Sequence, residues 1–175
     1  DADAEAILQD YFSKFYGPAG KAMREHFEVM EDAYERADYH TGNVFDIPHI
    51  LTPKVMKKMA RTLVRAERAV PAESIYARRL AMIRVAFDFG KSTLDMMAAM
   101  NRFDFEQAQQ HLHYIKEELL PIALTHEPAI LSLYYGQRFT DRFWTDTVES
   151  AYQRICDGNE IVAKLPDQWL FLQDP

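Results

Sequence analysis

Residues 4–18 read AEAILQDYFSKFYGP, and this stretch is the clearest indication of the fold. Its apolar residues recur at intervals of three and four, the spacing that places side chains on one face of an α-helix. Gly17 and Pro18 follow at once, and both residue types are typical of the end of a helix. The stretch therefore predicts an amphipathic helix that packs one face against the rest of the protein.

The same periodicity continues beyond Pro18. A second helix is predicted to begin there and to place four residues on one face: Met23, Phe27, Met30 and Tyr34. The pattern breaks over residues 38–51, which we interpret as an ordered loop. Thr52 and Pro53 are a typical N-cap and first helical residue, so they predict the start of a third helix.

A fourth helix is predicted over residues 72–100. Its middle is apolar on most sides, so we expect it to be central, and Gly90 within it suggests a close crossing with another helix. Asp104 is expected to cap a fifth helix, which Pro121 kinks or ends.

The last helical part of the chain is predicted as a short helix over residues 128–135 and a long helix over residues 137–157. The expected inward residues of the long helix are Phe139, Phe143, Ala151 and Ile155. No repeat of solenoid length relates the segments. The prediction is an all-α domain over residues 1–158, an irregular bundle of about six or seven helices.

The ends of the chain suggest a piece of a larger protein. It opens without Met inside the first predicted helix. Residues 165–172, LPDQWLFL, have strand-forming composition after a turn-like Pro-Asp. We expect residues 159–175 to form a strand-like exit arm that leads into a β-rich domain outside this chain.

Composition excludes several classes of protein. The apolar fraction of 48% and charged fraction of 27% are ordinary for a globular domain, and no apolar run is long enough to span a membrane. A single cysteine, Cys156, excludes an internal disulfide and a cysteine-based metal site.

Charge is unevenly distributed along a chain of net charge −7. Residues 54–84 carry nine basic and only two acidic side chains, whereas residues 25–38 carry six acidic ones. A basic stretch can bind polyanions, but here no basic loop or aromatic platform suited to nucleic acid accompanies it. The preferred interpretation is that the basic stretch faces the acidic one in the folded protein.

No catalytic or metal-binding motif is found. The Glu-x-x-His pairs of carboxylate-bridged metal bundles are absent, and the nearest arrangement is His113 one helical turn before Glu117. Cys156 lies at a predicted helix C-terminus, where the helix dipole opposes thiolate formation. We therefore expect no metal, no cofactor and no catalytic residue in this chain.

Aromatic residues supply the candidate contact sites. A ring with a polar group suits either sugar stacking or an interface between domains, with core packing as the alternative. The candidates for interdomain or sugar contacts are Tyr11, Tyr16, Tyr39, His49, Trp144, Trp169 and Phe171.

Three stretches together resemble a helical region of unknown function in large bacterial proteins. They are residues 7–19 (ILQDYFSKFYGPA), residues 23–27 (MREHF) and residues 165–171 (LPDQWLF) with Asp174 and Pro175. Those proteins join an α-glucuronidase-like or hexosaminidase-like part to a (β/α)8 barrel and then to this region, often followed by a β-sandwich. The resemblance covers residues 4–175, with a specific opening phrase and a generic middle.

The resemblance implies a context rather than a reaction. Catalytic residues would lie on the barrel, and the parent would be a secreted, cell-surface or periplasmic protein of polysaccharide breakdown. The leading hypothesis is a non-catalytic accessory domain that buttresses the barrel and links it to the β-sandwich of the same polypeptide.

Two other hypotheses remain. One is a self-standing interaction or dimerisation module, for instance a homodimer, that binds its partner through Arg61, Arg65 and Arg68. The other is a small helical enzyme that uses His113 and Glu117.

Overall fold

The computed structural model describes residues 3–38, 44–126, 130 and 136–161. Every regular element within these residues is helical, so the predicted all-α fold is confirmed. The longer helices are α1 (Ala4–Tyr16), α2 (Gly20–Glu35), α4 (Pro53–Arg68), α5 (Ile75–Asn101), α6 (Phe105–Tyr114), α7 (Leu120–Thr125) and α9 (Ser150–Cys156).

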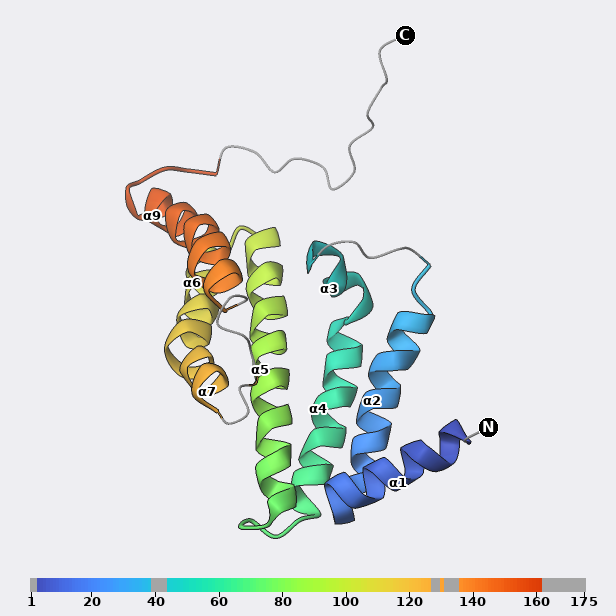
Figure 1. Ribbon diagram of the computed structural model, residues 1–175. Helices are drawn as coiled ribbons and strands as arrows, with labels where there is room; N and C mark the ends of the chain where they lie inside the picture. The colour runs from blue at the N-terminus through green and yellow to red at the C-terminus, as the bar shows by residue number, and fades with distance from the viewer. Residues whose placement is uncertain (1–2, 39–43, 127–129, 131–135, 162–175) are drawn as a thin grey trace.

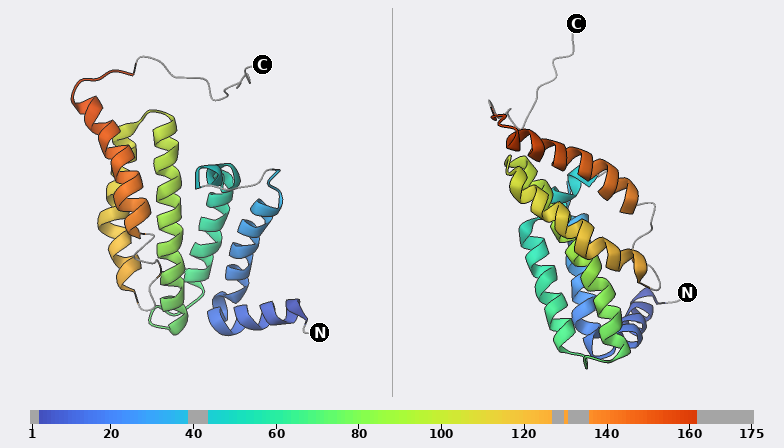
Figure 2. Two further views of the ribbon diagram at one scale, coloured as in Figure 1. Left: turned by 45° about the horizontal axis from the view of Figure 1, so that its top comes forward. Right: turned by 90° about the vertical axis from the view of Figure 1, so that its left-hand side faces the viewer.

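The helices form two groups on either side of α5. Figure 1 shows α2 and α4 on one side of α5 and α6, α7 and α9 on the other, while α1 runs across the foot of α2. Figure 2 shows that α6 and α9 run obliquely to α2 and α4. The bundle is therefore irregular, as the sequence predicted.

Two glycines make the corner between α1 and α2, where residues 17–19 form one 3₁₀ turn. Gly17 has a φ of +52°, and a Cβ there would lie 2.5 Å from the ring of Tyr76. A Cβ on Gly20 would lie 2.6 Å from the carbonyl oxygen of Phe12. This corner therefore requires a residue without a side chain at both positions.

The segment predicted as a loop contains two short helical pieces. A 3₁₀ turn, Val44–Asp46, leads directly into α3 (Ile47–Ile50), so the loop prediction is wrong for its second half. Pro48 lies in the first turn of α3, where the missing N–H of proline removes no helical hydrogen bond. The proline thus fits a helix start instead of a loop.

Capping residues begin the next two helices. The predicted cap of α4 is confirmed, because Thr52 Oγ1 accepts a hydrogen bond from the Val55 N–H at 3.4 Å. At the start of α5, Ser74 Oγ accepts one from the Ala77 N–H at 3.1 Å. Both contacts satisfy backbone donors that a helix start otherwise leaves unpaired.

Buried apolar residues form two separate clusters. The first core consists of Phe12, Tyr16, Ala19, Ala22, Met23, Met56, Met59, Leu63, Ala66, Leu80 and Phe87. The second core consists of Met96, Met97, Ala99, Ala108, Leu112, Trp144 and Val148. The N-terminal half of α5 belongs to the first core and its C-terminal half to the second, so α5 is central as predicted.

Gly90, between these two halves of α5, does not mark a close helix crossing. Among the described residues, no atom beyond its own helical turns lies within 4 Å of the position that its Cβ would take. The predicted crossing is therefore wrong, and the glycine leaves open space beside α5.

Two features mark the path from α5 through α6 to α7. Asp104 caps α6 as predicted, with Oδ1 accepting from the Gln107 N–H at 3.1 Å. A π-helical segment, Ile115–Leu119, then joins α6 to α7, and Pro121 lies in the first turn of α7. The wider π turn accommodates the proline, so the helical path continues past it.

The last helical part differs from its prediction in which side faces inward. It comprises a π-helical segment, Gly136–Glu149, followed by α9. Its buried residues include Trp144 and Val148, whereas Phe143 is 39% and Ile155 40% exposed. The predicted inward face is wrong for both residues. Phe143 lies in the π-helical segment, where hydrogen bonds join residues five apart, whereas a spacing of three and four assumes an α-helical turn. Ile155 lies in α9, which follows that segment.

Two predicted elements fall wholly or largely outside the described residues. Of the predicted short helix over residues 128–135, the structure describes only residue 130. Of the predicted exit arm over residues 159–175, it describes only residues 159–161, and these do not form a strand.

Candidate functional site

The N-terminal half of α1 exposes apolar side chains that nothing in the described structure covers. Ile7 is 56% exposed, Leu8 46% and Tyr11 44%. These three residues belong to the apolar stripe that the sequence predicted to be packed inward. Only Phe12 and Tyr16, from the C-terminal half of α1, are buried in the first core.

Polar contacts hold α1 firmly against the bundle. The Arg24 guanidinium on α2 pairs with Glu5, with Nη2 2.7 Å from Oε2, and its hydrogen bond is the main cause that lowers the pKa of the Glu5 carboxyl. Arg79 on α5 donates to the Phe15 carbonyl at 2.6 Å and lies 4.2 Å from the centre of the Phe15 ring. The exposed face of α1 is thus carried on a fixed helix.

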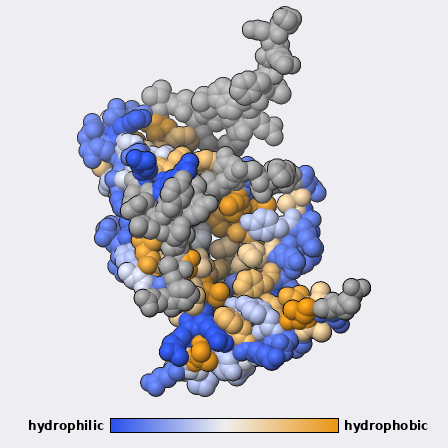
Figure 3. All heavy atoms as spheres, in the orientation of Figure 1, coloured by the Kyte–Doolittle hydropathy of each residue, from blue (hydrophilic) through white to orange (hydrophobic). Residues whose placement is uncertain are grey.

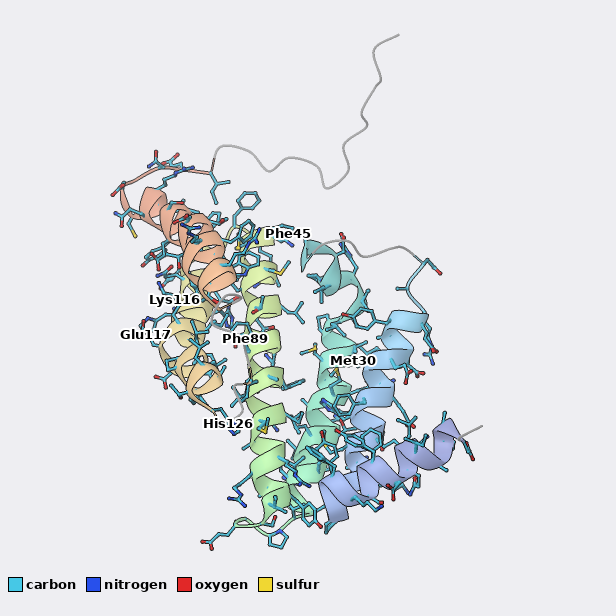
Figure 4. The ribbon with its side chains drawn as sticks, viewed as in Figure 1. Met30, Phe45, Phe89, Lys116, Glu117 and His126 are labelled. Carbon is cyan, nitrogen blue, oxygen red and sulfur yellow. The ribbon has the colours of Figure 1, made fainter. Side chains whose placement is uncertain are left out.

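A second feature is an apolar groove between α5 on one side and α2, α3 and α4 on the other, with a volume of about 400 Å³. Figure 3 shows apolar side chains gathered in the hollow between these helices. Figure 4 labels Met30 on α2 and Phe89 on α5, both of which line it. The groove is lined by His26, Phe27, Met30, Tyr34, Ile47, Leu51, Met56, Met59, Ile83, Ala86, Phe87, Phe89, Gly90, Thr93, Leu94 and Met97.

His26 is the one imidazole among the described residues that line this groove, and its side chain is buried. Nδ1 lies 3.0 Å from the Met59 carbonyl oxygen and 3.1 Å from Thr62 Oγ1. A carbonyl oxygen only accepts, so Nδ1 carries the proton and donates to it. Burial lowers the pKa of His26, the Met59 hydrogen bond opposes this shift and the Arg84 charge adds to it. The ring is therefore neutral at neutral pH.

The sequence did not identify this groove as a site. Two features of the sequence could have pointed to the groove. One is Gly90, an isolated glycine within an apolar helix, and the other is His26, which lies at helical spacing from Met23 and Met30. The glycine was interpreted as a helix crossing, and a histidine on an apolar face is not by itself a distinctive pattern.

The structure places the predicted contact residues in different surroundings. Tyr11 is exposed on α1, and His49 is exposed on α3. Tyr16 and Trp144 are buried in the first and second cores, and burial raises the pKa of the Tyr16 hydroxyl. These two side chains are not available to a partner in this arrangement. The remaining three candidates, Tyr39, Trp169 and Phe171, lie outside the described residues.

An aromatic cluster joins the two sides of the bundle near α3. The ring of Phe45 lies 5.6 Å from that of Phe143 and 5.9 Å from that of Trp144. Trp144 is buried, whereas the other two rings are partly exposed. Of these three residues, the sequence analysis named Trp144 as a contact candidate. The structure exposes Phe45 and Phe143 instead.

The catalytic alternative gains no geometric support. The side chains of His113 and Glu117 are both exposed and form no hydrogen bond or ion pair within the described part of the chain. Figure 4 shows Glu117 and Lys116 on the side of α5 away from α2 and α4, where Lys116 Nζ pairs with Glu149 at 3.1 Å. Among the described residues no three His, Cys, Asp or Glu side chains gather as a metal site.

The basic stretch meets acidic neighbours at several points. Arg65 on α4 pairs with Glu25 on α2, the complementary contact expected from the charge pattern. Arg84 pairs with Glu67 at 2.8 Å, within the basic stretch itself. Arg61 and Arg68 are exposed and have no ion pair within the described residues.

No family model matches the chain, and neither a curated protein nor a solved structure matches it. The resemblance of residues 7–19 to the helical region of α-glucuronidase-like proteins therefore stays a prediction. Of the helices that the structure describes, none combines the length and apolar character that crossing a membrane requires.

Proposed function

We propose that this chain is a non-catalytic helical domain that docks onto a neighbouring protein domain through the exposed face of α1. The observation that carries this proposal is the exposure of Ile7, Leu8 and Tyr11 on a helix that is otherwise fixed to the bundle. Contiguous exposed apolar side chains are typical of interaction sites, and tyrosine is enriched in them. A fixed helix also loses little conformational freedom on binding.

The partner we propose is another domain of the same polypeptide. The resemblance supports a glycoside hydrolase-like parent with a (β/α)8 barrel before this domain and a β-sandwich after it. A secreted or cell-surface location belongs to the same proposal and rests on the same resemblance. In this arrangement the reaction belongs to the barrel, and the helical domain keeps the barrel stable.

The first experiment is to measure the mass of the native protein that carries this segment, by antibody blot of the source cells and medium. A mass several times the 20.4 kDa of this chain supports a neighbouring domain in the same polypeptide. A mass near 20.4 kDa overturns that proposal.

The second experiment substitutes Ile7, Leu8 and Tyr11 together by serine in the native protein. We expect the melting temperature of the neighbouring domain to fall, while the helical domain alone keeps its own melting temperature because these side chains are exposed. Val64→Ser and Ile122→Ser, at exposed positions on α4 and α7, are the matched controls. An unchanged neighbouring domain would refute docking through α1.

The alternative is a self-standing module that forms a homodimer through the same face of α1. An apolar helix face can pair with a second copy of itself, which is the usual symmetry of a dimer. Sedimentation of the isolated chain separates the two proposals: a dimer that the triple serine variant dissociates supports the alternative, and a monomer supports docking onto another domain.

A further inference from the structure

We infer that the groove between α2, α3, α4 and α5 is a binding site for a small uncharged molecule with an apolar body and one hydrogen-bond donor. Alkylphenols and long-chain alcohols have this chemistry. The site is separate from the face of α1 and does not depend on docking.

The size and lining of the groove define the body of the ligand. Its volume of about 400 Å³ lies in the range of small-molecule pockets. No carboxylate, lysine or arginine is found among the described residues that line it, and His26 is neutral at neutral pH. A charged ligand would lose its hydration without a compensating partner, so the occupant is uncharged.

His26 supplies a polar contact on the inner wall. Nδ1 donates to the Met59 carbonyl, so Nε2 of the neutral ring is an acceptor. Within the described residues, Nε2 forms no hydrogen bond. Protein atoms do not enclose it completely. It is therefore open to the groove that His26 lines, where a ligand hydroxyl would complete its hydrogen bonding.

Two hydroxyl groups also belong to the described lining. The Thr93 hydroxyl donates to the Phe89 carbonyl at 2.9 Å, and its oxygen can still accept a hydrogen bond. Tyr34 is exposed and belongs to the rim. On the described lining, a ligand therefore meets the unpaired Nε2 of His26, the Thr93 hydroxyl oxygen and mostly apolar side chains.

Methionine methyl groups report on the groove directly. Met30, Met56, Met59 and Met97 line it, whereas Met23 and Met82 do not, so ¹³C-methyl NMR of the whole chain contains its own control. The probes are 4-hexylphenol and its methyl ether, which share an apolar body and differ in the donor. We expect both to shift the four groove resonances and the phenol to bind about two- to tenfold more tightly.

Gly90 offers a way to close the groove without disturbing its walls. The position of its Cβ is open, so the side chain of Gly90→Leu extends into the groove, while Gly90→Ala adds one methyl group and is the matched control. We expect Gly90→Leu to weaken phenol binding more than tenfold and Gly90→Ala to retain most of it. An unchanged Met23 resonance verifies that both variants are folded.

Three outcomes would overturn the inference. The first is equal affinity of the two probes, and the second is binding that survives Gly90→Leu. The third is a groove that protein already fills. Groove resonances that change on dilution would show that a second copy of the chain fills it. Groove resonances that change in Trp169→Ser would show that the chain's own C-terminal residues fill it.

Discussion

The two cores of this bundle differ in the regularity of the helices that build them. The first core is built mainly by α1, α2, α4 and the first half of α5, which are α-helical, with Ala19 added from the 3₁₀ turn between α1 and α2. The second core uses the last half of α5, α6 and the π-helical segment Gly136–Glu149. Apolar spacing predicts the inward face of a helix only where the backbone keeps the turn that the spacing assumes.

The largest effect is expected for Trp144, which tests the inward face of the π-helical segment. Trp144→Ala should lower the free energy of unfolding by about 3–5 kcal/mol, because it removes the largest side chain of the second core. Phe143→Ala, at the exposed neighbouring position, should cost much less. Urea unfolding of both variants is the measurement. A larger loss for Phe143 would mean that the segment keeps an α-helical turn.

The next effect concerns the α1–α2 corner of the first core. Gly20→Ala should lower the free energy of unfolding by about 1–3 kcal/mol, because the new Cβ would lie 2.6 Å from the Phe12 carbonyl oxygen and the backbone must shift. Thermal unfolding followed by circular dichroism measures the change. A neutral substitution would show that α1 moves easily away from α2.

The opposite sign is expected where the two cores meet on α5. Gly90→Ala should raise the free energy of unfolding by up to about 1 kcal/mol, since alanine favours the helix and no other described part of the chain lies within 4 Å of its Cβ. The same unfolding assay applied to Gly20→Ala gives the matched control, because it makes the same substitution at a crowded position. A loss of stability at both positions would indicate that the groove closes over Gly90 in solution.

The smallest effect is a pH dependence that belongs to the first core. His26 has a folded pKa below its ordinary value of 6.5, so the unfolded chain binds a proton where the folded chain does not. Stability should therefore be complete above about pH 6.5 and decline as the pH falls below it. Urea unfolding at about pH 7.5 and about pH 5.5 should show a smaller difference for His26→Gln than for the natural chain. Equal differences would contradict this assignment.

The sequence predicted the fold class and several helix boundaries because these depend on local chemistry. Thr52 and Asp104 are caps by residue type, and the Gly17-Pro18 pair marks a helix end wherever it occurs. The burial of Trp144 in place of Phe143 was not predictable in this way, since it depends on a π-helical turn that tertiary packing selects.

The candidate sites were predicted less well than the fold. The stripe on α1 was identified, but its spacing alone does not tell whether Ile7 and Leu8 meet this bundle or another protein. The groove arises because no neighbouring element among the described residues packs against Gly90, and its four helices come from distant parts of the chain. An empty space has no pattern in the sequence, so only the three-dimensional arrangement reveals it.

One continuous helix of 27 residues, α5, takes part in both cores. Opening either core alone leaves the other holding half of α5, so the amides in its middle are released only when both have opened. We therefore expect those amides to be among the slowest in the chain to exchange with deuterium, and their exchange to report global unfolding. A helix shared in this way makes one cooperative folding unit out of two clusters that share no buried residue.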